Sequence, residues 1–196
     1  MNEIVENKFF SLIYRSRYIE RWATSNKKSS DNLSEHIFST TMISLLLANI
    51  YMNEIGKELI KYDELLLFSL FRDIEDIYTA HIIGPIKKQN IETQKMFKEI
   101  KNIFSKKFFL TLPQGPNIFL KKLDVAKKNN LIQEITESSD IIDAYIFCEL
   151  EVMSGNNDFK AKAKEFREKV EKIKKKKYVK IFFEEYFDIE KIELIY

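Results

Sequence analysis

Glycine and proline are scarce in this chain, with four Gly and three Pro among 196 residues. Sandwiches and barrels need frequent sharp turns, so this scarcity argues against both. The abundant Leu, Ile, Lys and Glu favour long helices instead, and hydrophobic residues, at 45% of the chain, suffice for a packed core. We therefore expect an all-α helical bundle that forms a single domain over residues 1–196.

Charge of one sign is lacking as well. The chain has 32 Lys and Arg against 30 Asp and Glu, which gives a formal net charge of +2. A protein that binds a nucleic acid polymer usually carries a marked excess of basic residues. The composition gives no such excess, so we do not expect a nucleic acid polymer as the partner.

Cysteine and long hydrophobic runs are also rare. The one cysteine, Cys148, cannot form an intramolecular disulfide, which fits a reducing compartment, and its apolar neighbours favour a buried structural thiol over a nucleophile. The first ten residues carry Glu3 and Glu6, unlike a signal peptide. Apolar runs such as Met42–Ile50 fall short of the roughly 20 residues of a membrane span. We expect a soluble, cytoplasmic protein without membrane contact.

Hydrophobic spacing divides the chain into helices that are separated by a few clear breaks. Gly84-Pro85, the segment Leu112–Pro116 and Gly155–Asn157 are the strongest of these breaks. Ser34 is predicted to cap the long second helix, and Asp63 to cap the third. The predicted helices cover Asn7–Trp22, Glu35–Ile55, Tyr62 or Asp63 through Ile77, Ile91–Phe109, Asn117–Lys128, Asn129–Ser154, Phe159–Lys177 and Tyr178–Phe187.

A few polar residues stand in apolar surroundings and are candidates for chemistry. His36 begins the second helix; taken alone it could be a satisfied core histidine or a metal ligand. Asp73 and Asp76 interrupt an apolar helix and, three residues apart, would share one helix face. Asp140 precedes another apolar stretch. Buried carboxylates need a cation or hydrogen bonds, but spacing alone leaves capping or exposed positions equally open for Asp76 and Asp140.

The segment Asn32-Leu33-Ser34-Glu35-His36 closely matches a known Asn-Val-Ser-Glu-His motif. This motif and the order of the segments around it resemble those of the HD-domain phosphohydrolases, in particular the bacterial 5′-deoxynucleotidases, and the similarity covers nearly the whole chain. The other matching segments are Phe9-Phe10, Arg17–Trp22, Arg72-Asp73, Thr79–Lys87, Asp140, Ala144-Tyr145, Cys148–Glu151 and Gly155–Phe159.

The resemblance implies an HD-type helical bundle in which one divalent ion, such as Co²⁺, Mn²⁺, Mg²⁺ or Zn²⁺, is held by His36, Asp73 and Asp140. The family's His-Asp doublet would supply a fourth ligand, but Arg72 replaces its histidine here. A guanidinium has no lone pair to offer and its charge opposes a cation. The resemblance therefore predicts a metal site that has lost one ligand and binds its ion weakly or not at all.

Further roles follow from the same resemblance. Asp76 would assist catalysis, and Arg72 could serve as a phosphate-binding or transition-state-stabilising group. Arg21 and Trp22 match the pair that contacts the nucleotide, while His81 stands where the family has a carboxylate and could be a substitute ligand or an incidental change. The implied activity is phosphate release from (deoxy)nucleoside 5′-monophosphates by a homodimer. The alternative is a degenerate HD domain that binds a nucleotide, a phosphate or a protein partner without hydrolysis.

Overall fold

The computed structural model describes residues 3–56, 59–80, 82, 89–112 and 117–192. Within these ranges the chain folds into helices without a β-strand, which confirms the predicted all-α fold. The α-helices are α1 (Glu3–Arg15), α2 (Leu33–Glu54), α3 (Tyr62–Phe71), α4 (Asp76–Thr79), α6 (Ile91–Phe109), α7 (Asn117–Ala126), α8 (Asn130–Met153), α9 (Lys160–Ile173) and α10 (Lys177–Ile181). Short 3-10 or π segments are η1 (Ser16–Tyr18), η2 (Asn157–Phe159), η3 (Phe182–Tyr186) and η4 (Ile189–Lys191).

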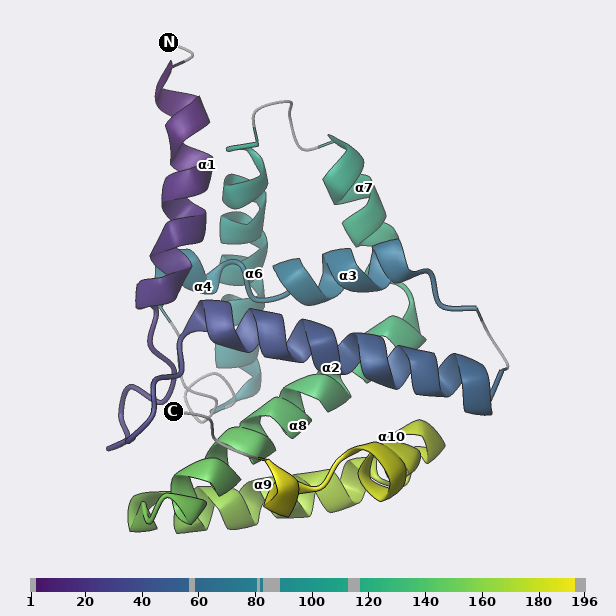
Figure 1. Cartoon of the computed structure of the whole chain (residues 1–196). Helices are drawn as coiled ribbons and strands as arrows, with labels where there is room; N and C mark the ends of the chain where they lie inside the picture. The colour runs from purple at the N-terminus through teal and green to yellow at the C-terminus, as the bar shows by residue number, and fades with distance from the viewer. Residues whose placement is uncertain (1–2, 57–58, 81, 83–88, 113–116, 193–196) are drawn as a thin grey trace.

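The two longest helices, α2 and α8, form the centre of the bundle (Figure 1). α2 packs against α8 on one side and α3 on the other; α9 lies along α8, and α10 contacts α2. α1, α6 and α7 stand beyond α3, with α7 in contact with it. The three elements α2, α3 and α8 therefore meet in the interior, where side chains from distant parts of the sequence can converge.

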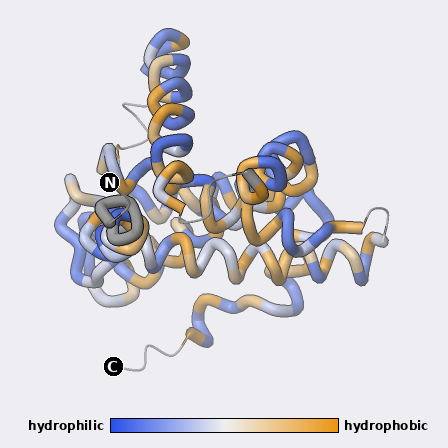
Figure 2. The backbone as a smooth tube through the Cα atoms, turned by 90° about the horizontal axis from the view of Figure 1, so that it is seen from above, coloured by the Kyte–Doolittle hydropathy of each residue, from blue (hydrophilic) through white to orange (hydrophobic). Residues whose placement is uncertain are grey.

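Helices of two kinds build the core: α2 and α3 are apolar on nearly all sides, whereas outer helices such as α1 and α9 are amphipathic. Hydrophobic and hydrophilic residues alternate along most of the backbone (Figure 2), as expected for helices that bury one face. The main cluster lies between α2, α3, α8 and α10 and includes the fully buried Leu47, Leu65 and Ile135. A second cluster contains Phe108 and Phe109 of α6. None of the helices described is long and apolar enough to cross a membrane.

α2 begins two residues earlier than the sequence predicted, at Leu33 instead of Glu35. Asn32, rather than Ser34, is the N-cap: its side chain accepts hydrogen bonds from the backbone N–H groups of Ser34 and Glu35. The Glu35 carboxylate accepts from the Asn32 N–H in return, which completes a capping box. This cap fixes the first turn of α2, and His36 lies one residue beyond it.

The end of α3 also differs from the prediction. The sequence suggested a helix through Ile77, but α3 ends at Phe71 and a turn separates it from the four-residue helix α4. Arg72 and Asp73 therefore lie in this turn rather than within a helix. Asp63 does not cap α3; Lys61 is the N-cap residue, without a side-chain hydrogen bond. The predicted first helix likewise ends early, at Arg15, and continues as η1 to Tyr18.

Candidate active site

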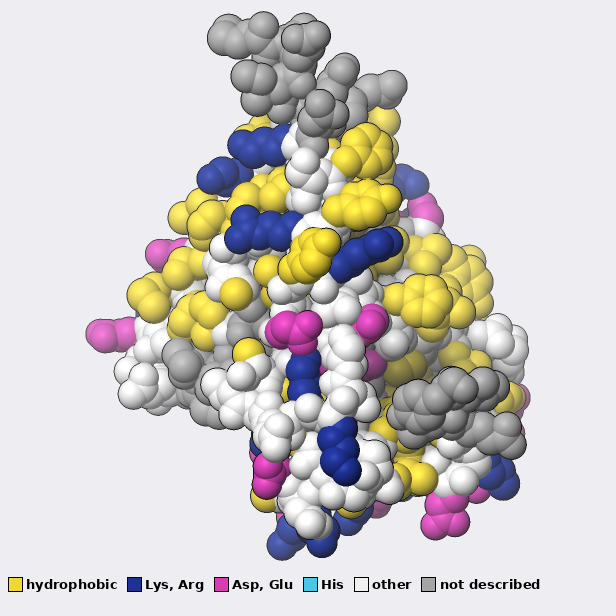
Figure 3. Space-filling model, turned by 60° about the vertical axis from the view of Figure 1, so that its left-hand side comes forward, with side chains coloured by type: hydrophobic (Ala, Val, Ile, Leu, Met, Phe, Trp, Pro, Cys, Tyr) yellow, Lys and Arg dark blue, Asp and Glu magenta, His cyan; other side chains and the backbone are white. Residues whose placement is uncertain are grey.

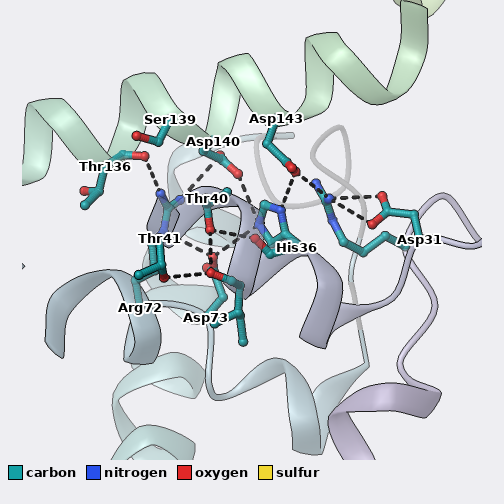
Figure 4. Close-up of polar contacts among 12 residues, drawn as sticks. Asp31, His36, Thr40, Thr41, Arg72, Asp73, Thr136, Ser139, Asp140 and Asp143 are labelled. Carbon is teal, nitrogen blue, oxygen red and sulfur yellow. Dashed lines mark hydrogen bonds and ion pairs between the residues drawn. The ribbon is translucent and has the colours of Figure 1, made fainter. Parts of the chain in front are cut away.

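Three of the residues selected from the sequence converge from separate elements. His36 comes from the first turns of α2, Asp73 from the turn after α3, and Asp140 from the middle of α8 (Figure 4). The Nε2 atom of His36 lies 3.3 Å from Oδ1 of Asp140 and 3.8 Å from Oδ2 of Asp73. One nitrogen of a single imidazole thus lies near two carboxylates from other parts of the chain.

A third carboxylate, that of Asp143, holds the other nitrogen of the imidazole. Its Oδ2 lies 2.7 Å from Nδ1 of His36. Burial of His36 opposes its charged form, but the hydrogen bonds with Asp140, Asp143 and Asp73 outweigh burial and raise the pKa of His36 to about 10. The Asp143 contact orients the ring so that Nε2 faces the two remaining carboxylates.

The guanidinium of Arg72 lies between the same two carboxylates. Its Nε is 3.1 Å from Oδ2 of Asp73, its Nη2 is 3.4 Å from Oδ2 of Asp140, and its Nη1 donates to the Thr136 carbonyl over 2.8 Å. Burial opposes charge on all of these groups. The hydrogen bond from His36 and the charge of Arg72 nevertheless lower the pKa of Asp140 to about 2, and Arg72 holds the pKa of Asp73 well below its usual range. Both carboxylates are ionised.

Lys101 of α6 supplies a second cation to this cluster. Its Nζ lies 3.1 Å from Oδ1 of Asp73 and forms an ion pair with the buried carboxylate of Glu75. Burial raises the pKa of Glu75 to about 7, although the Lys101 charge acts in the opposite direction. Asp73 is therefore paired on one oxygen with Arg72 and on the other with Lys101.

A cavity of about 220 Å³ adjoins Arg72 and Asp73. It opens between α3, α6 and α8, with Phe68 and Phe71 on its apolar side. Its basic side chains are Arg72, Lys101 and Lys127. Two of these three cations already pair with carboxylates, so the cavity offers a mixed, polar surface rather than a purely cationic one.

The predicted substrate-binding residues Arg21 and Trp22 lie on the Asp143 side of the cluster. Arg21 is 5% exposed, and its Nη1 lies 3.0 Å from Oδ2 of Asp31 and 3.1 Å from Oδ2 of Asp143. Trp22 donates from its indole nitrogen to Asp31 over 2.7 Å and stacks on Phe147 with ring centroids 5.7 Å apart. Arg21 thus connects to His36 through Asp143, and Trp22 is packed into an aromatic cluster.

Two other candidates have different outcomes. Asp76 is 3% exposed at the first position of α4, so it is buried rather than a surface residue. Asp73 lies in the turn that follows α3 and Asp76 begins α4, so the two residues are not on one continuous helix as their spacing suggested. His81 and the segment Gly84–Lys87 lie outside the described residues.

The sequence reasoning missed two residues that hold this site together, Asp143 and Lys101. Asp143 follows Asp140 by three residues on α8, and this spacing places both on one helix face, so the signal was present. Lys101 carries no such local signal. It reaches Asp73 only because α6 packs beside the turn after α3, and its sequence neighbours resemble any solvated helix.

Comparison with known proteins places this site in a family. The family model described as "5′-deoxynucleotidase YfbR-like" matches residues 8–189. The 4′-phosphooxetanocin A phosphatase of Priestia megaterium is 32% identical over 180 residues, which cover 90% of each chain.

Two solved structures share the fold. An HD-domain phosphohydrolase from Listeria innocua matches with a TM-score of 0.74 and 20% identity, over 92% of this chain and 86% of the other. The cyanophage S-2L HD phosphohydrolase DatZ matches with a TM-score of 0.59 and 16% identity, over 92% and 87%. With the family model spanning nearly all of the sequence, the chain belongs to the YfbR-like 5′-deoxynucleotidase family.

Proposed function

We propose that this chain is a metal-dependent phosphomonoesterase that releases phosphate from (deoxy)nucleoside 5′-monophosphates. The observation that carries the proposal is the convergence of His36, Asp73 and Asp140 from three elements, next to a polar cavity. The names of similar proteins support it: the family description is that of 5′-deoxynucleotidases, the Priestia relative is a phosphatase, and the cyanophage enzyme was solved with dA and one catalytic Zn²⁺ ion.

The donor atoms of the cluster suit a divalent ion in their chemistry. One imidazole nitrogen and two carboxylates are ligands for Zn²⁺, Mn²⁺ or Co²⁺, and three protein ligands are enough for a catalytic ion. Ligand bonds of about 2.0–2.2 Å put neighbouring ligands of one ion roughly 3 to 3.5 Å apart, and the two distances from His36 Nε2 are 3.3 and 3.8 Å.

The spacing is not yet that of a finished metal site. Among the described residues, no group of three or more His, Cys, Asp or Glu side chains is already arranged to hold an ion. Asp73 would have to move closer to Nε2 of His36 on binding, because their 3.8 Å separation exceeds that of two ligands of one ion. We propose Co²⁺, Mn²⁺, Mg²⁺ or Zn²⁺ as the ion.

The chain's own residues would divide the remaining work. A bound ion would polarise a phosphoryl oxygen of the substrate and lower the pKa of a water molecule. Asp143 holds Nδ1 of His36 and so keeps Nε2 directed at the site. Arg72, which lines the cavity, would bind the substrate phosphate through its guanidinium. Asp76 would orient the attacking water or carry a proton.

Substrate recognition is proposed to involve Arg21, Trp22 and His81. The buried Nε of Arg21 has no hydrogen-bond partner among the described residues, so this donor remains for a ligand. Trp22 would form part of the wall of the nucleotide pocket, on the same side as Arg21. We further propose that the protein acts as a homodimer in the cytoplasm, where its one buried cysteine, Cys148, would stay reduced.

Phosphate release from the common nucleoside monophosphates with each of the four ions tests the proposal. Asp73→Asn is expected to lower kcat/KM by about 100-fold, because it removes a charged ligand, whereas Asp124→Asn, on the exposed side of α7, should leave it unchanged. No turnover with any ion and nucleotide, in a protein that still binds nucleotide by calorimetry, would instead favour the degenerate binding domain.

A further inference from the structure

Arg72 makes three polar contacts, one through each nitrogen of its guanidinium group. Each of its guanidinium nitrogens has an oxygen within 3.4 Å: Nε has Asp73, Nη2 has Asp140 and Nη1 has the Thr136 carbonyl. Thr136 and Asp140 lie one turn apart on the same face of α8. The planar group therefore lies along α8 and is fixed at both ends (Figure 4).

These contacts use atoms that an ion would need. Oδ2 of Asp73 is the oxygen that faces Nε2 of His36, and it is the same oxygen that Arg72 Nε contacts. Asp140 divides its two oxygens between His36 and Arg72. A divalent ion held by His36, Asp73 and Asp140 would have to draw both carboxylates away from the guanidinium or lie beside a fixed positive charge.

The carboxylates also do not depend on an ion for charge compensation. Asp73 pairs with Arg72 and Lys101, and Asp140 with Arg72, all through side chains of the same molecule. A buried carboxylate without a cation is strongly unfavourable, yet each of these already has one. The cluster is thus stable as a purely protein network.

We propose that Arg72 is an internal cation that competes with the divalent ion for Asp73 and Asp140. The site then assembles without metal, and the ion binds weakly because it must displace an ion pair as well as do without a fourth ligand. The inference rests on the proposed function in that it concerns the same ion. It separates two effects of one residue: the missing ligand and the opposing charge.

Calorimetric titration of Mn²⁺ and Zn²⁺ into the metal-free full-length protein tests this without any activity measurement. Arg72→Gln removes the charge but adds no strong ligand, so it should tighten binding by about 10- to 100-fold, the usual range for changes next to a metal ligand. Arg72→His should tighten it further. Arg72→Lys keeps the charge and should stay as weak as the natural protein.

Arg167, which pairs through Nε and Nη2 with the carboxylate of Glu149, is a matched control. Arg167→Gln and Arg167→His should leave metal affinity unchanged. Tight binding by the natural protein, or a gain with Arg72→His but none with Arg72→Gln, would overturn the competition, since only the ligand count would then matter.

A second measurement guards against variants that do not fold. In the natural protein, the Nε–H resonance of Arg72 should shift when saturating Mg²⁺ or Zn²⁺ is added, because the ion pair between its Nε and Asp73 is lost; the Arg167 resonance should not. Metal binding that leaves the Arg72 signal in place would contradict the proposal. Both results are independent of turnover, so failure of the phosphatase activity and failure of this inference can be told apart.

Discussion

Glu75 and Lys101 form a pair whose charge state matters at the residue scale. Glu75 is almost fully buried, and its neighbours include a cation, Lys101, and a second carboxylate, Asp73. Burial raises its pKa from 4.5 to about 7, so the folded protein keeps the Glu75 proton at pH values where the unfolded chain has lost it. Ionisation of this one group therefore opposes folding near neutral pH.

Glu75→Gln should make this effect visible. Between pH 4.5 and 7 the unfolded chain binds fewer protons at this position than the folded one, so the natural protein loses stability as pH rises, by about 3 kcal/mol in total. The variant lacks that loss. Its stability relative to the natural protein should rise over this window and stay level above pH 7, as measured by urea unfolding at a series of pH values. A difference that is constant from pH 4.5 to 8 would contradict it.

Resemblance rather than pattern identified the site at this scale. Taken alone, His36 fits a core position and Asp140 a capping or exposed one as well as a metal ligand; only the matching segments give these two residues and Asp73 a common role. Their meeting depends on how α2, α3 and α8 pack, and no local pattern encodes that. Asp143 was within reach of the three-residue spacing on α8, whereas Lys101 contacts Asp73 through tertiary packing alone.

At the scale of elements, one buried carboxylate ties α8 to the loop that carries Arg21, Trp22 and Asp31. Glu151 is fully buried and accepts hydrogen bonds from the backbone N–H groups of Lys28, at 2.9 Å, and Ser29, at 2.7 Å. The Asn156 side chain donates to the same carboxylate. The loop is therefore held against the end of α8 by two backbone donors and not by apolar packing alone.

Replacement of Glu151 by Gln should loosen this loop. An amide has one acceptor oxygen, so one buried N–H loses its partner, and unfolding should become easier by about 1–3 kcal/mol. Hydrogen exchange at the Lys28 and Ser29 amides should accelerate more than exchange in α2. Glu165→Gln, at an exposed ion pair with Lys169 on α9, is the control and should change neither. Unaltered exchange at both loop amides would show that the carboxylate does not anchor the loop.

The sequence predicted whole helices better than their ends. α6 begins at Ile91 and ends at Phe109 as expected, because Asn90 caps its start and its polar spacing is regular. The third helix was predicted too long, since its apolar residues continue past Phe71 although the chain turns there. The turn is stabilised by contacts of Arg72 and Asp73 with other elements, which a local pattern does not contain.

The whole molecule exposes apolar side chains on one of its faces. Figure 3 brings the α1 side forward and shows hydrophobic side chains gathered there among basic ones. Phe10, Tyr14 and Tyr18 of α1 and η1 are 59%, 58% and 81% exposed. Phe10 and Tyr14, four residues apart, share one helix face. Such a face suits the homodimer that we propose.

Light scattering coupled to size-exclusion chromatography should therefore report a dimer, and Tyr14→Glu should shift it to a monomer by placing a charge in the contact. Leu59→Glu, at a residue that is 85% exposed elsewhere on the molecule, should leave the dimer intact. A monomer at micromolar concentration in the natural protein would refute the assembly, and an unchanged dimer in Tyr14→Glu would place the interface on another face.

Cys148 gives the molecule an internal reporter. It is the one thiol of the chain, it is fully buried on α8 beside Phe159 and Ala163, and burial raises the pKa of its thiol to about 12. A disulfide reagent can modify it only when α8 and α9 separate. The rate of that modification in the native protein therefore measures how often the contact between α8 and α9 opens, without any engineered label. Comparing this rate with the rate in urea would show whether the two helices separate locally or only when the whole chain unfolds.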